Sequence, residues 1–589
     1  MKLFGNSRHA RHSNKKVKGH GCLTLLLILA IIVGGVAYFP RTDGSLADCC
    51  ERIVWSFARE PADALANIPN PQSPYRKLSG QRVFAFARSY DLPLVPTVNP
   101  QENETRERIW DYWRRVRRLG VKDLNVNGHE KMWRDYMDSF TFKTNGAPLK
   151  GGDAPIREMV GRLQSLGFRV GPYNNFTDFA PVNENWDPNK VVRHTTAFVP
   201  WTNQMAHAWT RTYLPKPVYA VHAMETLLPV VKAKFGFQNA YSDVHTAYAP
   251  WYRIDYDRRM PGAGSMTGSF YSYGELLHKQ KFIWDGPVYS EGWGHVIYAG
   301  LSDGDFARDD DYFSGGHSGP KATSWDWPWI VDYDLRRIHP LNNCIGTMAR
   351  NFYGRHKPAD PDEYADRHTC YVLAFGHALV FHNGFFMRDN SLMIDERLEL
   401  RNYYMPLAAA KRYTQAEATE IRYGDAEDRL LDSAHAIASG AVALNHVKVT
   451  YSDGTVVAVN GSRTKPFALD WSGRRLTLDP NCYVARSGDD VKVFSAFVDG
   501  HRADLAVTPE YVYLDGRGKL VSFDEGASDG LMIRLRYTSV VEKPLAADEE
   551  DVILRHATVA ELPYVAKRIV AMDQEGTAFT TLEPEIRGG

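Results

Sequence analysis

Between residues 80 and 430, short apolar runs of strand character alternate with stretches whose apolar residues repeat at helical spacing. The run RVFAFAR at 82–88 predicts a strand, and residues 104–119 predict an amphipathic helix that ends at Gly120. The alternation continues with strands at 121–126, 168–173, 239–244 and 286–291, and with helices at 154–166, within 215–235, at 271–284 and at 398–413. This pattern is typical of an α/β fold with a parallel sheet.

Beyond residue 440 the apolar positions change to period two. Residues 447–451 and 455–459 flank Asp453 and Gly454, which predicts a hairpin with a D-G turn. Further short strands are expected near 466–471, 474–478, 482–485, 490–498, 503–507, 510–514, 519–523 and 530–538. The pattern indicates an antiparallel β-sandwich. Packing against the preceding region is the favoured role, with glycan binding as the alternative. Residues 541–589 are acidic and then weakly helical in pattern.

The N-terminus has the pattern of an export segment. Residues 1–20 carry Lys and Arg but no acid, and residues 22–39 form an uncharged apolar run. That run is near the ~20 residues needed to span a bilayer, so it is a membrane anchor or a signal peptide. Small-x-Ala sequences at 35–37 and 45–47 leave cleavage open, and a proline-rich linker follows. We expect the remainder outside the cytoplasm (periplasm or cell surface), either anchored or secreted.

Size and charge narrow the class of protein. A chain of 589 residues is expected to hold two or three domains, and a net charge of +0 gives no basic surface for nucleic acid. The expected division is a basic segment with the anchor or signal peptide at 1–40, a linker at 41–78, a catalytic barrel at 79–435, a β-sandwich at 440–540 and an extension at 541–589. The 14 Trp and 31 Tyr suit a sugar site, although core packing is the more frequent role of any single aromatic residue.

Other chemistries find little support. The six cysteines show no C-x-x-C or zinc spacing, and a disulfide between Cys344 and Cys370 stays open. There is no G-x-S-x-G, H-E-x-x-H or P-loop motif. The acidic residues between 303 and 311 lack EF-hand spacing, so a solvated loop is favoured over calcium. We expect no cofactor, with a structural calcium ion as the alternative.

Two carboxylates stand at strand ends. Asp243 ends the run at 239–244 and Glu291 ends the run at 286–291, with one helix between them. Carboxylates at the C-terminal ends of parallel strands point into one pocket. Retaining glycoside hydrolysis needs such a pair, since one carboxylate attacks the anomeric carbon and the other carboxyl protonates the leaving oxygen.

The surroundings in the sequence suggest which carboxyl plays which role. Asp243 suits the nucleophile because His245 or Arg253 nearby would keep it ionised. Glu291 suits the acid/base because neighbouring Tyr289, Trp293 and Pro287 would surround it with apolar faces and raise its pKa. The alternative is a structural role, in which acids at strand ends cap helices or form salt bridges.

Polar and aromatic residues of the loops after the strands are candidates for substrate binding. They are His129, Trp133, Asp135, Lys150, Asp153, Asn174, Asn175, Asp178, His245, Trp251, Asp255, Trp293 and Asp332. For the segment 129–135 a salt-bridged helix start is an equal alternative. For Asp153 a helix N-cap is favoured. Other acids compete with the pair: Asp255 and Asp257 lie close downstream of Asp243, and Asp332 and Asp334 end another strand-like run.

Four short motifs carry a family resemblance: Tyr-Ser-Asp-Val at 241–244, Ser-Glu-Gly at 290–292, KGGD at 150–153 and YNNFTD at 173–178. With them, residues 119–420 resemble the bacterial glycoside hydrolase clan of endo-α-N-acetylgalactosaminidases and α-N-acetylgalactosaminidases (families 101 and 129) and uncharacterised relatives. The resemblance implies a (β/α)8 TIM barrel and retaining hydrolysis of an α-linked sugar. It also implies Asp243 as nucleophile and Glu291 as acid/base.

The expected partners are an oligosaccharide or glycoconjugate substrate and, through the N-terminal segment, a membrane. One alternative is a non-catalytic carbohydrate-binding protein on the same barrel. Another is a membrane-anchored glycosyltransferase, for which the sequence shows no clear nucleotide-sugar site.

Overall fold

The computed structural model describes most of the chain between residues 55 and 582, with gaps. The described residues are 55–58, 64–65, 70–86, 106–128, 133, 135, 138–139, 141–194, 197–198, 200–201, 212–247, 249–291, 297–305, 327–338, 360–381, 396–524, 526–528, 531–535, 551–554, 568–572 and 578–582.

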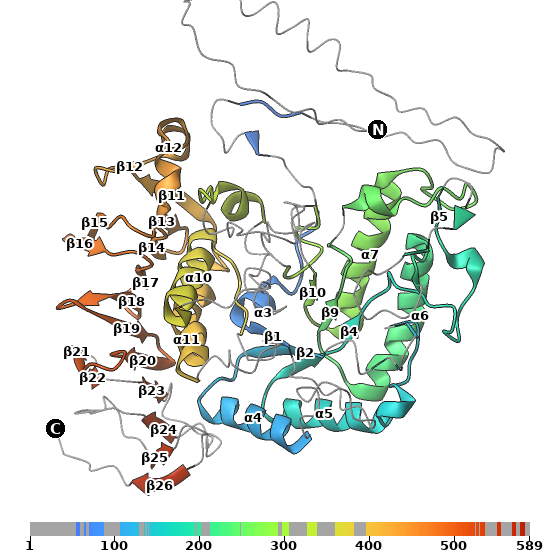
Figure 1. Ribbon diagram of the computed structural model, residues 1–589, viewed down its shortest axis with the longest axis horizontal. Helices are drawn as coiled ribbons and strands as arrows, with labels where there is room; N and C mark the ends of the chain where they lie inside the picture. Colours follow the sequence, from blue (N-terminus) through green and yellow to red (C-terminus); the bar gives the residue numbers. More distant parts are fainter. Residues whose placement is uncertain are drawn as a thin grey trace, which may run out of the picture.

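Among the described residues, six short strands form the parallel part of the molecule, in two groups of three (Figure 1). Strand β1 (Val83–Phe86) pairs with β2 (Leu124–Asn127), and β2 pairs with β3 (Arg169–Gly171). After Pro172 the same stretch continues as β4 (Tyr173–Asn174), which pairs with β9 (Ala240–Ser242), and β9 pairs with β10 (Val288–Ser290). The predicted α/β pattern with parallel strands is confirmed.

Two further segments extend this row at its ends. Phe84 forms a parallel bridge with Val380, and the Phe381 N–H donates to the Phe84 carbonyl oxygen at 2.7 Å. At the other end Tyr289 forms a parallel bridge with Gly304, whose carbonyl oxygen accepts from the Ser290 N–H at 2.9 Å. The row of parallel segments therefore runs from 379–381 through β1, β2, β3 with β4, β9 and β10 to 303–305.

The predicted helices at 104–119, 154–166, 215–235 and 271–284 are present, and α3 (Arg76–Gln81) is an additional short helix at the end of the expected linker. The other helices of this part are α4 (Arg106–Arg118), α5 (Asp153–Ser165), α6 (Pro217–Phe235) and α7 (Met266–Trp284). Helix α6 begins with Pro217 and ends at Gly236 in the left-handed region, as helix stops commonly do. Helix α7 starts at Met266 rather than at 271, because the Ser265 hydroxyl accepts from the Gly268 N–H and caps it there.

Short elements fill the loops between these helices and strands. They are η3 (Pro148–Lys150), η4 (Pro188–Lys190), β5 (Arg193–His194), β6 (Ala197–Phe198), β7 (Pro200–Trp201), β8 (Thr212–Tyr213), η5 (Pro250–Arg253) and the π-helical turn η7 (Asp334–Ile338).

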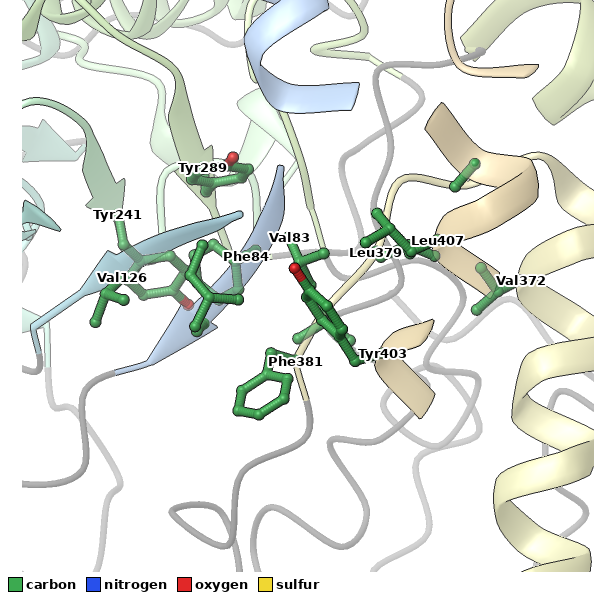
Figure 2. Close-up of a cluster of buried hydrophobic side chains, with 14 of the residues drawn as sticks. Val83, Phe84, Val126, Tyr241, Tyr289, Val372, Leu379, Phe381, Tyr403 and Leu407 are labelled. Atoms are coloured by element: carbon green, nitrogen blue, oxygen red, sulfur yellow. The ribbon is translucent and has the colours of Figure 1, made fainter. Parts of the chain in front are cut away.

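Two long helices, α10 (Pro361–Phe375) and α11 (Glu396–Tyr413), join the parallel strands to the C-terminal part. Figure 2 shows the contact, in which Val83 and Phe84 of β1 lie close to Phe381, Tyr403 and other apolar side chains. The apolar run at 369–381 thus has two parts. Its first half is the last turns of α10, up to the C-cap Gly376, and its second half is the segment beside β1.

The C-terminal part is one long sheet rather than two equal layers. Within the described residues it holds 12 strands in the order β12-β11-β13-β14-β17-β18-β19-β20-β23-β24-β25-β26, antiparallel except for the pair β24–β25. The bounds are β11 (Ala418–Gly424), β12 (Leu430–Leu431), β13 (His446–Tyr451), β14 (Val456–Asn460), β17 (Tyr483–Ser487), β18 (Val491–Val498), β19 (His501–Val507), β20 (Tyr511–Asp515), β23 (Leu531–Leu535), β24 (Asp551–Leu554), β25 (Arg568–Met572) and β26 (Ala578–Leu582). Helices α12 (Ser433–Ser439) and η11 (Ala441–Leu444) interrupt its start.

This sheet differs from the predicted sandwich at both ends. It begins at Ala418, before the boundary expected at 440, because the chain enters β11 directly after α11. Its last three strands lie in the stretch expected to be weakly helical. Their short apolar runs, such as Val552–Leu554 and Ile569–Met572, add edge strands to an existing sheet instead.

The second layer is partial. The hairpin β15 (Phe467–Trp471) with β16 (Arg474–Leu478) covers one face of the sheet, where Phe467 and Leu478 pack with Val484. A smaller hairpin, β21 (Val521–Phe523) with β22 (Gly526–Ser528), adds to it. The opposite face packs on α10 and α11, and the Tyr404 ring of α11 lies 4.8 Å from that of Tyr511. The described sheet is sandwich-like in this limited sense, and packing on the preceding region is confirmed.

Buried charges cross the same interface. Arg517 donates to both carboxylate oxygens of Asp366 in α10, at 2.7 and 2.8 Å, and also to Asp504. Cys370 nearby is a free buried thiol whose Sγ donates to the Cys482 carbonyl oxygen at 3.6 Å. Cys344, the partner considered for a disulfide with Cys370, lies outside the described residues.

Within the part of the chain that the structure describes, we find no helix with the length and apolar character of a membrane span. The predicted anchor or signal peptide at 22–39 lies outside the described residues.

The tight approach of the parallel strands predicts a large effect for one glycine. A Cβ on buried Gly171 would meet the Asn239 carbonyl oxygen at 2.5 Å and Asn127 Oδ1 at 2.6 Å. We expect Gly171→Ala to destabilise the protein by about 1–3 kcal/mol through overpacking. Chemical denaturation measures this loss. The control is Gly161→Ala, on an open face of α5 with nothing within 4 Å, which should stabilise by about 0.5–1 kcal/mol. Equal effects of both variants would contradict the packing argument.

Candidate active site

The predicted carboxylates stand side by side at the same end of adjacent strands. Ser242 of β9 pairs in register with Ser290 of β10, so Asp243 and Glu291 follow at the same level. Neighbouring strands lie about 4.8 Å apart, which brings the two side chains within reach of one substrate atom. As whole residues both are half-buried, while the Glu291 carboxyl itself lies in a buried setting.

Two tyrosine hydroxyls hold the Asp243 carboxylate. Tyr173 donates to Oδ2 at 2.6 Å, and Tyr241 donates to Oδ1 at 2.8 Å. Burial and the charges of Asp243 and Glu291 raise the pKa of Tyr241, so this hydroxyl keeps its proton. Hydrogen bonds to both oxygens favour the ionised form of a carboxylate and leave it poorly suited to carry a proton.

Glu291 lies in a different electrostatic setting. Burial, followed by the negative charges of Asp243 and Asp305, raises its pKa well above the ordinary value. The guanidinium of Arg253 acts in the opposite direction. The prediction of a raised pKa for Glu291 is thus in agreement with the structure, and the adjacent Asp243 adds to the burial that the sequence suggested.

Arg253 is the buried cation of the site. It comes from η5, its side chain is 1% exposed, and its guanidinium lies 5.6 Å from the centre of the Tyr273 ring. Its Nη2 also donates to the Val244 carbonyl oxygen at 3.5 Å. Arg253 therefore brings a positive charge close to the chain segment that carries Asp243.

His245 is not the charged partner that the sequence suggested for Asp243. Burial and the charge of Arg253 lower its pKa to about 3, so the ring is neutral in ordinary buffers. Its Nδ1 lies 2.8 Å from the backbone carbonyl oxygen of Asp243 rather than near the carboxylate. His245 therefore acts on the backbone of the site, and its buried ring is closed to a ligand in this structure.

Asn175 and Asp178 form a polar network beside the pair. Asn175 Nδ2 donates to Asp178 Oδ2 at 2.6 Å and to the Tyr173 hydroxyl at 3.4 Å. The Thr212 hydroxyl donates to Asp178 Oδ1 at 3.1 Å. The YNNFTD loop thus connects to Asp243 through Tyr173, and the structure brings Asn175 and Asp178 to the site as predicted.

Asn174 points away from the site. Its Nδ2 donates at 2.9 Å to Oε1 of Gln280 in α7, which also accepts from the Ser242 hydroxyl. Side chains alternate between the two faces of a strand, so Asn174 and Ser242 face the helix while Tyr173 and Asp243 face the site. The predicted substrate-binding role of Asn174 is wrong for this reason.

Three more residues predicted to bind substrate make structural contacts instead. Trp133 is 4% exposed and packs against Phe235 and Phe237, so it is a core residue. Asp255 is buried and ion-paired with Lys216 at 3.3 Å. Asp332 accepts hydrogen bonds from Tyr423 at 2.7 Å and Ser433 at 2.6 Å, and so ties the parallel part to the C-terminal sheet. Apolar packing and ion pairing account for these positions.

The KGGD loop contacts α6 rather than the carboxylates. Asp153 is ion-paired at 2.7 Å with Lys234, in the last turn of α6, which leads to the opposite end of β9 from Asp243. Asp153 is also not the N-cap, because Gly152 holds that position and Asp153 accepts from the Gly146 N–H instead. Lys150 ends η3, and Asp135 accepts from the Leu149 N–H in the same loop.

Of the three remaining candidates, one lies on the surface and two lie outside the described residues. Trp251 is 51% exposed on η5, two residues before Arg253. His129 and Trp293 lie outside the described residues.

Sequence reasoning missed three residues that contact the pair, Tyr173, Tyr241 and Thr246. It also missed Asp305, whose charge helps to raise the pKa of Glu291. Tyr173 and Tyr241 bind the Asp243 carboxylate, and the Thr246 hydroxyl contacts both the Glu291 carbonyl oxygen and, at 3.0 Å, Asp305 Oδ1. The signal for Tyr241 was available, because a residue two positions before Asp243 on a strand shares its face. Tyr173, Thr246 and Asp305 come from other segments and needed the strand register.

Among the residues that the structure describes, no group of three or more His, Cys, Asp or Glu side chains is placed to hold a metal ion. Asp303 of the acidic stretch is ion-paired with Lys281 at 3.1 Å, while residues 309–311 lie outside the described residues.

Comparisons with known proteins give remote structural similarities only. No protein-family model and no curated protein matches the chain. Among solved structures, it is similar to the α-N-acetylgalactosaminidase NagBb of Bifidobacterium bifidum in complex with GalNAc, with TM-score 0.46, 14% identity and coverage of 68% of this chain and 58% of that one. It is also similar to the debranching enzyme of Nostoc punctiforme (TM-score 0.43, 11% identity, 71% of this chain and 100% of that one). A third similar structure is the α-amylase of Geobacillus thermoleovorans, with TM-score 0.43, 10% identity and coverage of 69% of this chain and 98% of that one. The chain spans 58% to 60% of the length of the Bifidobacterium enzyme, and similarity at this level does not define an activity.

The buried acid predicts a pH-dependent stability change in Glu291→Gln. The pKa of Glu291 is raised in the folded protein, so its favourable contribution is complete below the ordinary glutamate pKa and is lost as pH rises through the folded pKa. Glutamine does not titrate. We therefore expect Glu291→Gln to gain thermal stability relative to the wild type as pH rises, measured as melting temperature across pH 4–9. The control Glu184→Gln, at an exposed position, should show no such trend, and a parallel course of wild type and Glu291→Gln would contradict the raised pKa.

Proposed function

We propose that the protein is a retaining glycoside hydrolase that cleaves an α-linked sugar from glycans outside the cytoplasm. The observation that carries the proposal is the pair of adjacent carboxyl groups with opposite environments. Asp243 is held by two hydroxyl donors, and Glu291 is buried beside it with a raised pKa. Environments that push two carboxyl groups apart in pKa assign one as nucleophile and the other as acid.

The reaction follows in two steps. First, the Asp243 carboxylate attacks the anomeric carbon while the glycosidic C–O bond breaks and Glu291 gives its proton to the leaving oxygen. This forms a glycosyl ester on Asp243 and releases the aglycone as an alcohol. Second, the Glu291 carboxylate takes a proton from water, whose oxygen attacks the anomeric carbon and frees Asp243. Two displacements at one carbon restore the original anomeric configuration.

The electrostatic coupling of the pair fits both steps. The negative charge of Asp243 is the second cause, after burial, of the raised pKa of Glu291. Once Asp243 becomes an ester, that charge is gone and the pKa of Glu291 falls. Glu291 is therefore an acid when a proton must be given and a base when water must be activated.

The strand register favours retention over inversion. Retaining enzymes place their carboxyl groups about 5–5.5 Å apart, whereas inverting enzymes need about 6.5–9.5 Å to fit a water molecule. Asp243 and Glu291 directly follow a paired position on neighbouring strands, and strands lie about 4.8 Å apart. The tyrosines on both oxygens of Asp243 also favour direct attack by this carboxylate.

The parallel row of segments supports a (β/α)8 barrel as the architecture of the catalytic part. Helices α4, α5, α6 and α7 alternate with its strands, and the carboxylates stand at the strand C-termini, where barrels hold their sites. The α-linkage, with an N-acetylgalactosaminide as the leading sugar, is what the four sequence motifs imply. Action outside the cytoplasm is proposed from the basic and apolar N-terminal pattern.

Substitution of the two carboxyls tests the mechanism. With aryl glycosides as substrates, we expect Asp243→Asn to lower kcat by a factor on the order of 10⁴. Glu291→Gln should lower kcat/KM about 10²–10⁴-fold on poor leaving groups and far less on dinitrophenyl leaving groups, which need no proton. Its kcat should fall on both, because the second step loses its base. Azide should rescue Glu291→Gln and yield a glycosyl azide of retained configuration, detected by NMR. Full hydrolysis by Asp243→Asn would remove the assignment, and glycan binding without turnover would favour a non-catalytic binding protein.

The raised pKa of Glu291 predicts the alkaline side of the pH profile. The acid must carry its proton in the first step, so kcat/KM should fall as pH rises through the pKa of Glu291. This fall in kcat/KM should occur at a pH above the ordinary glutamate pKa, because burial and the charge of Asp243 raise the pKa of Glu291. In Glu291→Gln the fall should disappear. A fall that persists in this variant would assign the acid to another group.

A further inference from the structure

The four residues Asp243–Thr246 form a tight turn that contacts both carboxyl-bearing strands. The His245 N–H donates to the Asp243 carbonyl oxygen at 2.8 Å, which closes a three-residue γ-turn around Val244. The Ala247 N–H then donates to the Val244 carbonyl oxygen at 3.1 Å. The chain thus reverses directly after Asp243.

Val244 is strained in this turn. Its φ is 67°, in the left-handed region that a β-branched residue rarely adopts. A γ-turn with positive φ is itself the rarer and more strained class. Backbone strain of this kind persists only where the surrounding contacts hold it, and such positions cluster at functional sites.

The contacts that hold the strain come from His245 and Arg253. The Asp243 carbonyl oxygen accepts the backbone N–H of His245 and faces its ring Nδ1, both at 2.8 Å. The His245 ring is fully buried, and its Nε2 has no hydrogen-bond partner among the described residues. The Val244 carbonyl oxygen accepts from Arg253. These bonds fix the backbone from which the Asp243 carboxylate projects.

Thr246 links the turn to the second carboxyl. Its hydroxyl contacts the backbone carbonyl oxygen of Glu291 and, at 3.0 Å, Asp305 Oδ1. The Thr246 side chain thereby joins the turn after β9, the residue that follows β10 and the 303–305 segment. A shift of the turn would move Asp243 relative to Glu291.

We propose that Val244, His245 and Thr246 are positioning residues whose strained turn sets the separation of the Asp243 and Glu291 carboxyl groups. The proposal rests on the proposed function for its effect on hydrolysis. Its effect on the geometry of the pair can be measured without any substrate.

Val244→Gly tests the strain. Glycine adopts positive φ freely, so the turn loses its strain and its rigidity together. We expect kcat on an aryl glycoside to fall about tenfold with little change in KM, since a misplacement of about 1 Å can cost up to about 10²-fold, while the melting temperature stays equal or rises. The control is Ser472→Gly, at a positive φ of 57° in the β15–β16 turn, which should leave kcat unchanged. A loss of stability with unchanged kcat in Val244→Gly would overturn the proposal.

Thr246→Val tests the link to Glu291, and Thr246→Ser is the matched variant that keeps the hydroxyl. Glu291→Gln is added to the wild type and to each variant, and the melting temperatures with and without it are compared across pH. The pH window over which Glu291→Gln gains stability reports the pKa of Glu291 in that protein. In Thr246→Val, and in Val244→Gly, we expect the upper end of that window to move to lower pH, because Glu291 is less confined beside Asp243. Thr246→Ser should keep the wild-type window.

His245 is tested by two amides of different length. Asparagine places its Nδ2 where His245 has Nδ1, whereas glutamine places its amide where His245 has Nε2. We expect His245→Asn to retain most of kcat and the wild-type window for Glu291, and His245→Gln to lose both. Equal behaviour of the two variants would overturn the role of the Nδ1 contact.

Two measurements, glycoside hydrolysis and the pH window of the stability gain from Glu291→Gln, distinguish failure of the positioning role from failure of the proposed function. If no glycoside is hydrolysed by the wild type, the proposed function fails, yet the Glu291 window still decides whether the turn sets the pair. If hydrolysis is observed and the window is the same in Val244→Gly, Thr246→Val and the wild type, the positioning role is wrong.

Discussion

The register between β9 and β10 is the constraint on which the site depends. Because Ser242 pairs with Ser290, the next residue of each strand is a carboxyl-bearing residue at the same level. Two carboxylates so close would repel, and the structure separates their states by giving Asp243 two tyrosine donors and burying Glu291. A slip of one residue would turn Asp243 toward α7 and Ser242 toward the site. The proposed chemistry therefore depends on strand pairing as much as on residue type.

The sequence predicts the elements well and the site in part. Apolar periodicity places α4, α6, α11 and the strands that end at Asp243 and Glu291. It cannot tell which side of a strand a loop residue will face, and so Asn174 and Asn175 look equivalent although only Asn175 reaches the site. A buried ion pair is equally hidden, since Lys216 and Asp255 lie far apart in the chain. Strand alternation and tertiary pairing decide these positions, and neither can be read from local composition.

The C-terminal sheet supports the site from a distance. Asp332 receives hydrogen bonds from Tyr423 and Ser433, and Trp329 packs on Gly461, where a Cβ would collide with the indole ring. Helices α10 and α11 lie between the sheet and β1, so they transmit the packing to the parallel strands (Figures 1 and 2). An acidic strand end such as Asp332 thus marks an interface here, although its pattern matches that of a catalytic residue.

Neutral His245 and strained Val244 explain why the turn after β9 is built from these residues. Burial and the positive charge of Arg253 together lower the pKa of His245 to about 3, so the ring serves as a fixed donor at every ordinary pH. A flexible residue at 244 would remove the strain but would also release the Asp243 backbone. The carboxylate pair works only if its spacing resists the binding and departure of substrate, and a strained turn with several bonds provides that resistance. Rigidity at this turn is therefore a requirement of the proposed chemistry.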